Sequence, residues 1–252
     1  MRFLLLALFL ADYRSVNGLK MYYEVHGAGP PLVLLHGGTA TVATSFASII
    51  PAYAPTHRII APEQMGHGHT GDADRPLDYA AMADDTDALL EQLKVTGADV
   101  LGISDGGEVG LYLAGRHPGR VRRLIVMGAA FSTRDPVATA RWADRTTTRE
   151  WPASDTYRTM SPDGVAHWPV FMKKVLTLYK NWPGLSPAEI TAIRAPTMVV
   201  IGDHDAFSLE QVDQMKRSLP GARVCVLPDT THLQLVKRTE WLFPMITAFL
   251  AE

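Results

Sequence analysis

The sequence has a single cysteine, Cys225, no apolar run long enough to span a bilayer, and almost no net charge. One cysteine excludes an internal disulfide and a cysteine-rich zinc site. Lys and Arg total 24 against 26 Asp and Glu, which gives a net charge of −2. A surface built for a polyanion needs an excess of positive charge, so we expect no nucleic-acid partner. We also expect no stable membrane insertion, because a spanning helix needs about 20 apolar residues.

The segment 1–11 is the one candidate for export. Nine apolar residues, Phe3 to Ala11, follow Arg2. This length suits the apolar part of a secretory signal, about 7 to 15 residues, although Phe9 stands where cleavage favours a small residue. We expect a signal segment and hence a periplasmic or secreted protein. The alternative is a cytoplasmic protein in which this segment is an apolar extension of the domain.

What is present fits one α/β domain. Hydrophobic residues make up 47% and charged residues 20% of 252 residues, enough to bury a large core. Asn17-Gly18 predicts a β-hairpin near the start. Apolar runs of strand length then alternate with helical periodicity, as in Leu77 to Val95, whose acidic run Asp84 to Asp87 we expect on a solvated face. This alternation predicts a largely parallel, doubly wound sheet. The predicted strands are 31–35, 58–61, 99–103, 121–127, 196–201 and 223–227.

Residues 131–193 interrupt the alternation. They hold six prolines, four of the five tryptophans and no clear strand, so we predict a helical cap inserted in a core of 12–130 and 194–252. Trp142, Trp151 and Trp168 are candidate walls of a substrate pocket; the alternative is that they seal the cap onto the core. The sequence leaves the protein a monomer or a homodimer.

A glycine-flanked serine carries the chemistry. Gly102-Ile103-Ser104-Asp105-Gly106 matches the G-x-S-x-G nucleophile elbow. A strand-like run precedes the motif and a helix-like run follows it, so Ser104 is predicted at a sharp strand-to-helix turn. Such a turn brings the two backbones too close for a Cβ at Gly102 or Gly106. Ser104 is therefore the predicted nucleophile.

A serine hydroxyl needs a base to take its proton, and histidine titrates near neutrality. Among nine histidines, His232 follows the last predicted strand, at the edge where open α/β sheets bind ligands. Asp205 occupies the equivalent loop one strand earlier and would orient the imidazole, with Asp203 as the alternative acid. The order Ser104, Asp205, His232 is the one expected for this elbow.

Acyl transfer also needs backbone amides aimed at the oxyanion. Asp105, directly after the nucleophile, supplies one amide of the predicted oxyanion hole. Gly38, in the loop His36-Gly37-Gly38, supplies the other, with Gly37 as the alternative and as a substrate contact. We expect His36 to brace this loop. The carboxylate of Asp105 is either a substrate contact that favours cations or a group bonded within the fold.

From Tyr13 to Glu252 the chain resembles the α/β-hydrolase superfamily. The resemblance implies an α/β fold with a mostly parallel eight-stranded sheet, a small helical cap, and a Ser-Asp-His triad that needs no metal or other cofactor. Gln64-Met65 depart from the acidic residue and arginine common in the family, which leaves the bracing of that loop open. The motifs that carry the resemblance are His36-Gly37-Gly38, Gly66 to Thr70, Gly102 to Gly107, Gly202 to Asp205, and His232.

The elbow Ser104-Asp105-Gly106-Gly107 is also similar to that of biphenyl-hydrolase-like and valacyclovirase-type enzymes, in which an acid near the site recognises an amino group. We therefore predict a serine hydrolase of carboxylic esters with small to medium acyl groups. The alternatives are a lactonase, an amidase or aminoacyl-ester hydrolase, a carbon-carbon bond hydrolase, or a non-catalytic ligand receptor. His67 and His69 are expected to be turn residues, so no metal site is predicted.

Overall fold

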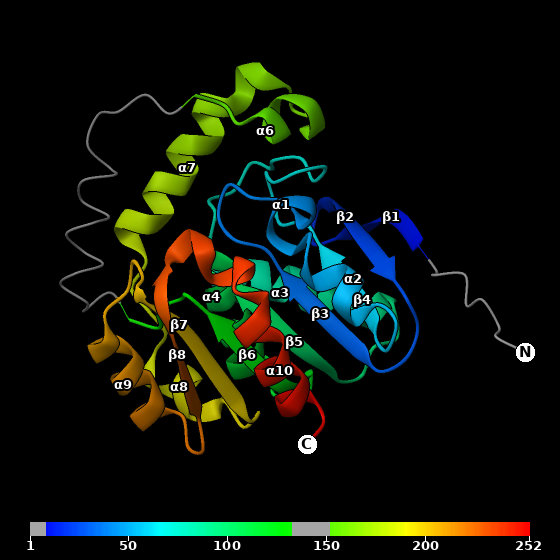
Figure 1. Cartoon of the computed structure of the whole chain (residues 1–252). Coiled ribbons are helices and arrows are strands. Elements are labelled where there is room, and N and C mark those ends of the chain that lie inside the picture. The colour runs from blue at the N-terminus through cyan, green and yellow to red at the C-terminus, as the bar shows by residue number, and fades with distance from the viewer. Residues whose placement is uncertain (1–8, 133–151) are drawn as a thin grey trace, which may run out of the picture.

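The computed structural model describes residues 9–132 and 152–252 (Figure 1). Trp142 and Trp151 lie outside these ranges, as do the first eight residues of the predicted segment 1–11. The last three residues of that segment, 9–11, belong to strand β1 (Phe9–Val16). Strand β1 pairs antiparallel with β2 (Leu19–His26). The turn between the strands uses positive φ at Asn17 (46°) and Gly18 (82°). The predicted hairpin is thus confirmed.

Eight strands form one sheet in the order β1-β2-β4-β3-β5-β6-β7-β8. Strand β2 runs antiparallel to both of its neighbours, and the other pairs are parallel. This confirms the α/β class and the mostly parallel eight-stranded sheet. The remaining strands are β3 (Pro31–Leu35), β4 (Arg58–Pro62), β5 (Ala98–Ile103), β6 (Val121–Met127), β7 (Thr197–His204) and β8 (Arg223–Thr231).

Helices cover both faces of the sheet because its strands are apolar on both sides. In β3, Val33 and Leu35 belong to one buried cluster, and Leu32 and Leu34 belong to the other. The first cluster includes side chains of α3 (Tyr79–Gln92), α4 (Asp105–Arg116) and α9 (Leu209–Ser218). The second includes side chains of α1 (Val42–Phe46), α2 (Ile49–Tyr53) and α10 (Thr239–Leu250).

The acidic run on α3 differs from its prediction. Asp85 is fully buried: its carboxylate accepts a hydrogen bond from the Asn17 side chain at 3.0 Å and pairs with Arg75. Asp84 pairs with Arg116. The prediction of a solvated face is therefore wrong for Asp85, because a distant cation and an amide replace water around its charge.

Between β6 and β7 the described residues are helical, with α6 (Asp155–Met160), η1 (Val165–His167), α7 (Trp168–Asn181) and α8 (Pro187–Ala192). Figure 1 shows α6 and α7 standing over one edge of the sheet. The carboxylate of Asp72, in the loop after β4, joins this cap to the core by accepting from Lys174 and His167, both at 2.8 Å. The domain boundaries at 131 and 193 stay a prediction. Within 9–132 and 152–252, no helix is both long and apolar enough to cross a membrane.

Candidate active site

Ser104 occupies the turn between β5 and α4. Its backbone has φ 52° and ψ −128°, a region that non-glycine residues rarely adopt. Such a conformation costs about 1 to 3 kcal/mol and persists only where the surroundings enforce it. The strand on one side and the helix on the other enforce it here. The effect is to lift the Ser104 side chain out of the sheet edge.

Two glycines allow the tight approach. A Cβ on Gly102 would lie 2.0 Å from the carbonyl oxygen of Gly106, and a Cβ on Gly106 would lie 1.9 Å from that of Leu35. Both distances are far below van der Waals contact, so β3, β5 and α4 can meet only where side chains are absent. The structure agrees with the sequence argument for these glycines.

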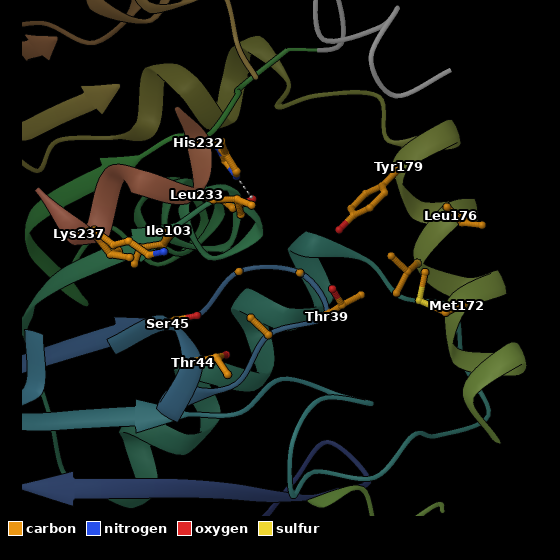
Figure 2. A pocket seen from close by; sticks show the side chains of 16 residues that line it. Thr39, Thr44, Ser45, Ile103, Met172, Leu176, Tyr179, His232, Leu233 and Lys237 are labelled. Carbon is orange, nitrogen blue, oxygen red and sulfur yellow. Dashed lines mark hydrogen bonds between the residues drawn. The ribbon is translucent and has the colours of Figure 1, made fainter. Parts of the chain in front are cut away.

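Ser104, His232 and Asp205 lie together. The Nε2 atom of His232 is 3.1 Å from the Ser104 hydroxyl oxygen, and its Nδ1 is 2.8 Å from an Asp205 carboxylate oxygen. In Figure 2 a dashed line from the labelled His232 ring marks its hydrogen bond in the pocket. The Asp205 side chain is fully buried, and the same carboxylate oxygen accepts the amide of Ala206 at 2.6 Å. Thus the three predicted side chains, 101 and 27 residues apart in sequence, meet at one sheet edge.

The hydrogen bonds decide the tautomer of His232. An ionised carboxylate can only accept, so Nδ1 carries the proton that is shared with Asp205. The Nε2 atom then presents a lone pair to the Ser104 hydroxyl. This is the arrangement in which an imidazole can take a proton from the serine as it attacks.

Asp203, the alternative acid, has a different role. Its carboxylate accepts the backbone amides of Asp229 at 3.0 Å and Thr230 at 2.9 Å. These bonds lower the pKa of Asp203, the one from Thr230 most strongly. Asp203 therefore holds the end of β8, just before His232, by these two hydrogen bonds. It does not contact the imidazole.

Asp203, His204 and Asp229 also form an exposed group with metal-ligand chemistry, their donor atoms lying within 4.8 Å of one another. Both oxygens of Asp203 already accept backbone amides, so the hydrogen bonding of the β7 and β8 ends accounts for this cluster. His67 and His69, predicted as turn residues, bond within their own turn: His67 Nδ1 donates to the carbonyl of Met65 at 3.0 Å.

The loop that carries Gly37 and Gly38 abuts the nucleophile. A Cβ on Gly37 would lie 3.3 Å from the Ser104 Cβ. His36, fully enclosed, accepts the amide of Gln64 at Nε2 (3.0 Å), so its Nδ1 donates to the carbonyl of Gly37 (2.8 Å). His36 thus braces this loop, as expected from the sequence.

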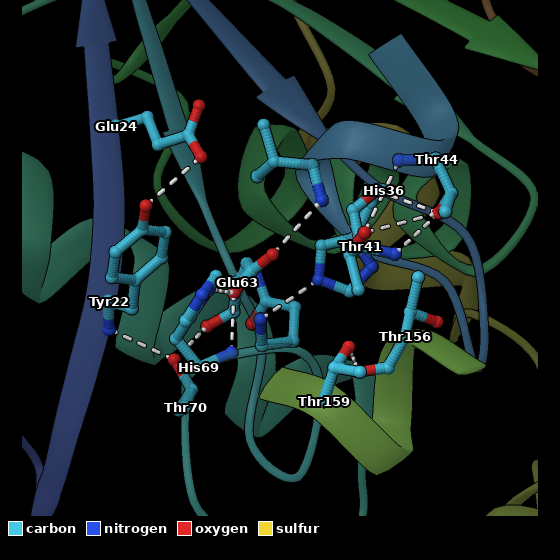
Figure 3. A network of polar contacts seen from close by, with 12 residues as sticks. Tyr22, Glu24, His36, Thr41, Thr44, Glu63, His69, Thr70, Thr156 and Thr159 are labelled. Carbon is cyan, nitrogen blue, oxygen red and sulfur yellow. Dashed lines mark hydrogen bonds and ion pairs between the residues drawn. The ribbon is translucent and has the colours of Figure 1, made fainter. Parts of the chain in front are cut away.

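Glu63 supplies the second brace, which the sequence left open. Its buried carboxylate accepts the amide of Val42 at 3.2 Å, the amide of His69 at 2.6 Å and the ring nitrogen of His69 at 2.9 Å (Figure 3). One acid therefore ties the loop leading into α1 to the turn after β4. The family commonly has an acidic residue at the position of Gln64, and in this chain the acidic side chain is Glu63, one position earlier.

The Asp105 carboxylate faces the fold. It accepts hydrogen bonds from the hydroxyl of Tyr179 on α7, at 3.0 Å, and from Tyr79 on α3. It does not line the pocket that opens at Ser104. Burial raises the pKa of Asp105 to about 6, although both tyrosines and His232 act in the opposite direction. The alternative that Asp105 is bonded within the fold agrees with this geometry better than substrate contact.

This raised pKa predicts a pH-dependent effect of Asp105→Asn on stability. Between about pH 4 and pH 6 folded wild type binds a proton that the unfolded chain releases, so its stability falls as pH rises through this window. Asparagine does not titrate. The free energy of unfolding of the variant relative to wild type should rise from pH 4 to pH 7, by up to about 3 kcal/mol. Urea unfolding at both pH values measures it, and a pH-independent difference would contradict it.

A pocket of about 400 Å³ opens at Ser104 and His232. One wall is α7, with Met172, Val175, Leu176 and Tyr179, and the opposite side includes Thr44 and Ser45 (Figure 2). The volume lies in the range of sites for small organic molecules. Most of the lining is apolar, so the pocket favours a small substrate with an apolar body.

Trp168 lies elsewhere. It is 8% exposed and packs against Tyr157 and Phe171, with ring centroids 4.8 and 5.7 Å away. Trp168 does not line the pocket at Ser104, in contrast to the prediction of a substrate contact. Tyr157 lies on α6 and Phe171 on α7, so these contacts pack the cap helices against each other, and the alternative that Trp168 seals the cap onto the core stays a prediction.

Gly128, directly after β6, is a functional position that the sequence analysis missed. Its φ is +54°, and a Cβ there would lie 2.9 Å from His232 Nδ1 and 2.7 Å from Leu235 Cδ1. The backbone of Gly128 therefore makes room for the imidazole. No local motif marks it, because the contact spans more than 100 residues.

Gly128→Ala should displace His232 and lower kcat by about 10- to 100-fold, since small misplacements of reacting groups cost that much. The matched control is Gly164→Ala: Gly164 also has positive φ (+74°) but nothing within 4 Å of an added Cβ. Both variants force a positive φ on alanine, at a backbone cost of about 1 to 3 kcal/mol each. Steady-state kinetics of both variants make the comparison, and equal activities would show that Gly128 does not position the imidazole.

The sequence matches a family model described as alpha/beta hydrolase fold over residues 30–164, more than half of the chain. The chain is similar to a pyrrolizixenacetamide deacetylase of Xenorhabdus hominickii, at 26% identity over 94% of this chain and 96% of that protein. It is also similar to a 2-hydroxymuconate semialdehyde hydrolase of a Pseudomonas species, at 36% identity. That second match spans 45% of this chain and only 41% of the Pseudomonas enzyme.

Among solved structures, the fold resembles 2-hydroxy-6-oxo-6-phenylhexa-2,4-dienoate hydrolase from a Rhodococcus species. The TM-score is 0.78 and the sequence identity 20%, over 98% of this chain and all of that one. An enol-lactonase from Burkholderia xenovorans gives a TM-score of 0.74 at 23% identity, covering 96% of this chain and 100% of its own. At these identities the likeness establishes the architecture.

Proposed function

The chain belongs to the α/β-hydrolase family, and from this we propose that it is a serine hydrolase that cleaves carboxylic esters of small to medium acyl groups. One observation carries the proposal: His232 lies between the Ser104 hydroxyl, at 3.1 Å, and the buried carboxylate of Asp205, at 2.8 Å. A hydroxyl, an imidazole of the required tautomer and a charged acid are the groups that acyl transfer needs.

In the proposed reaction, Ser104 attacks the ester carbonyl as His232 Nε2 takes the hydroxyl proton. The amides of Gly38 and Asp105 stabilise the oxyanion, and Asp205 stabilises the imidazolium. His232 then gives its proton to the leaving alcohol, and an acyl-enzyme remains. Water, activated by His232, releases the acid and restores Ser104. A Cβ added to Gly37 would lie 3.3 Å from the Ser104 Cβ, and this closeness of the loop to the nucleophile supports its assignment.

The same triad can cleave lactones, amides or the carbon-carbon bonds of diketones, and the relatives named above include a deacetylase and a lactonase. The pocket at Ser104 speaks against the cationic aminoacyl ester, since the carboxylate of Asp105 bonds to two tyrosines instead of lining the pocket. A non-catalytic receptor would keep the pocket but would have no need of a triad in hydrogen-bonding order.

A substrate panel tests the proposal. We expect wild type to release 4-nitrophenol from acetate to octanoate esters faster than it cleaves matched lactones, anilides, aminoacyl esters and diketones. Faster turnover of another member of the panel would reassign the bond. Binding of these compounds without any turnover would favour the receptor.

A further inference from the structure

One side of the pocket is the short helix η2 (His232–Lys237). Four of its six residues line the pocket, namely His232, Leu233, Val236 and Lys237. The helix therefore runs along the cavity, with the imidazole at its first residue and a lysine at its last. In Figure 2 Lys237 and Ile103 both lie on the side of the pocket opposite α7.

Among the lining residues that the structure describes, Lys237 alone carries a permanent charge. No aspartate or glutamate lines the pocket, and within the described ranges no acidic side chain forms an ion pair with Lys237. The lining also includes the apolar side chains of Ile103 and Val236. Lys237 is exposed, so it lies where the pocket meets solvent, and its charge attracts anions there without an acidic side chain in the lining to offset it. The pocket is thus polarised, positive at one end of η2.

We propose that Lys237 binds a carboxylate of the substrate, so that the enzyme prefers esters whose acyl chain ends in a negative charge. This inference rests on the proposed function, because it assigns the substrate class of the same site. The singly charged ammonium matches a singly charged carboxylate, and the hydroxyl of Ser45, also in the lining, can donate a hydrogen bond to it.

The helix sets the length of the preferred chain. His232 and Lys237 are five residues apart, and a 3-10 helix rises about 2.0 Å per residue, so their backbones are separated by roughly 10 Å. The flexible four-carbon stem of lysine can cover part of this span. A spacer of roughly four to six carbon atoms between the ester carbonyl and the carboxylate would cover the rest.

The test compares two substrates of the same shape: mono-4-nitrophenyl adipate, which is anionic, and 4-nitrophenyl 6-oxoheptanoate, in which a methyl ketone replaces the carboxylate. The quantity is the ratio of kcat/KM for the adipate to that for the ketone. In Lys237→Gln this ratio should fall by about 2- to 5-fold, mainly through KM, because Lys237 is exposed. Lys237→Arg should restore most of it, and added salt should lower it in wild type.

Lys173→Gln is the matched control, because Lys173 is exposed on α7, outside the pocket lining, and its replacement removes the same charge. An unchanged ratio in Lys237→Gln, or an equal fall in Lys173→Gln, would overturn the inference. Turnover of the neutral ketone ester by wild type tests the proposed ester hydrolysis separately. The preference for anionic esters can therefore be refuted while ester hydrolysis itself is supported.

Discussion

Ser104→Ala is expected to lower kcat for ester hydrolysis by at least about 10⁴-fold. The variant has no hydroxyl to attack the carbonyl, and His232 Nε2 loses its partner at 3.1 Å. The pocket keeps its apolar walls, so substrate should still bind. What activity remains would come from water and the oxyanion donors.

The same variant identifies the nucleophile. Wild type treated with a fluorophosphonate should gain one phosphonyl adduct in its intact mass, and Ser104→Ala should gain none. Ser15→Ala is the control, since Ser15 is exposed on β1 and should leave both the adduct and the rate unchanged. An adduct or near-normal turnover in Ser104→Ala would place the nucleophile elsewhere and remove the basis of the proposed reaction.

Of the site residues, Ser104 was the most directly predictable from local sequence. The elbow is a contiguous motif, and its glycines are required because a Cβ at Gly102 or Gly106 would lie about 2 Å from a backbone carbonyl oxygen. His232 and Asp205 were predictable for a different reason. Both follow strands of a parallel sheet, and the carboxyl ends of such strands meet at one edge.

The alternation of side chains along a strand could not decide whether Asp203 or Asp205 orients His232. Two residues apart on a regular strand, their side chains would share a face. The pairing of β7 with β8 instead shifts register between Gly202 and His204, and the amide of Asp205 turns back to the carbonyl of Gly202 at 3.2 Å. This irregularity separates the two carboxylates. The sequence contains no signal for it.

Residues that act through distant partners were also out of reach. Glu63 braces the loop beside Ser104 by accepting an amide 21 residues away in sequence, and Tyr179 meets Asp105 across 74 residues. Asp85 is buried because Arg75 and Asn17 come to it. In each case the side chain alone reads as an ordinary polar residue, and only the tertiary contact gives it a role.

Asp205→Asn should lower kcat by about 10⁴-fold while Asp203→Asn, which removes the same charge two residues earlier, should lower it only a few-fold. An amide at 205 would donate to His232 Nδ1, so the proton would move to Nε2 and the lone pair facing Ser104 would be lost. An amide at 203 keeps one acceptor for the amides of Asp229 and Thr230.

The two variants are compared by kcat at saturating ester and by their urea unfolding midpoints, which exclude global unfolding as the cause. Asp203→Asn should weaken the fastening of the β8 end by about 1 kcal/mol, the value of one hydrogen bond. A larger loss of kcat in Asp203→Asn than in Asp205→Asn would exchange the two assignments. The distance of 2.8 Å from the buried Asp205 to the imidazole requires the opposite order, because only a charge in contact with His232 can hold its tautomer through the reaction.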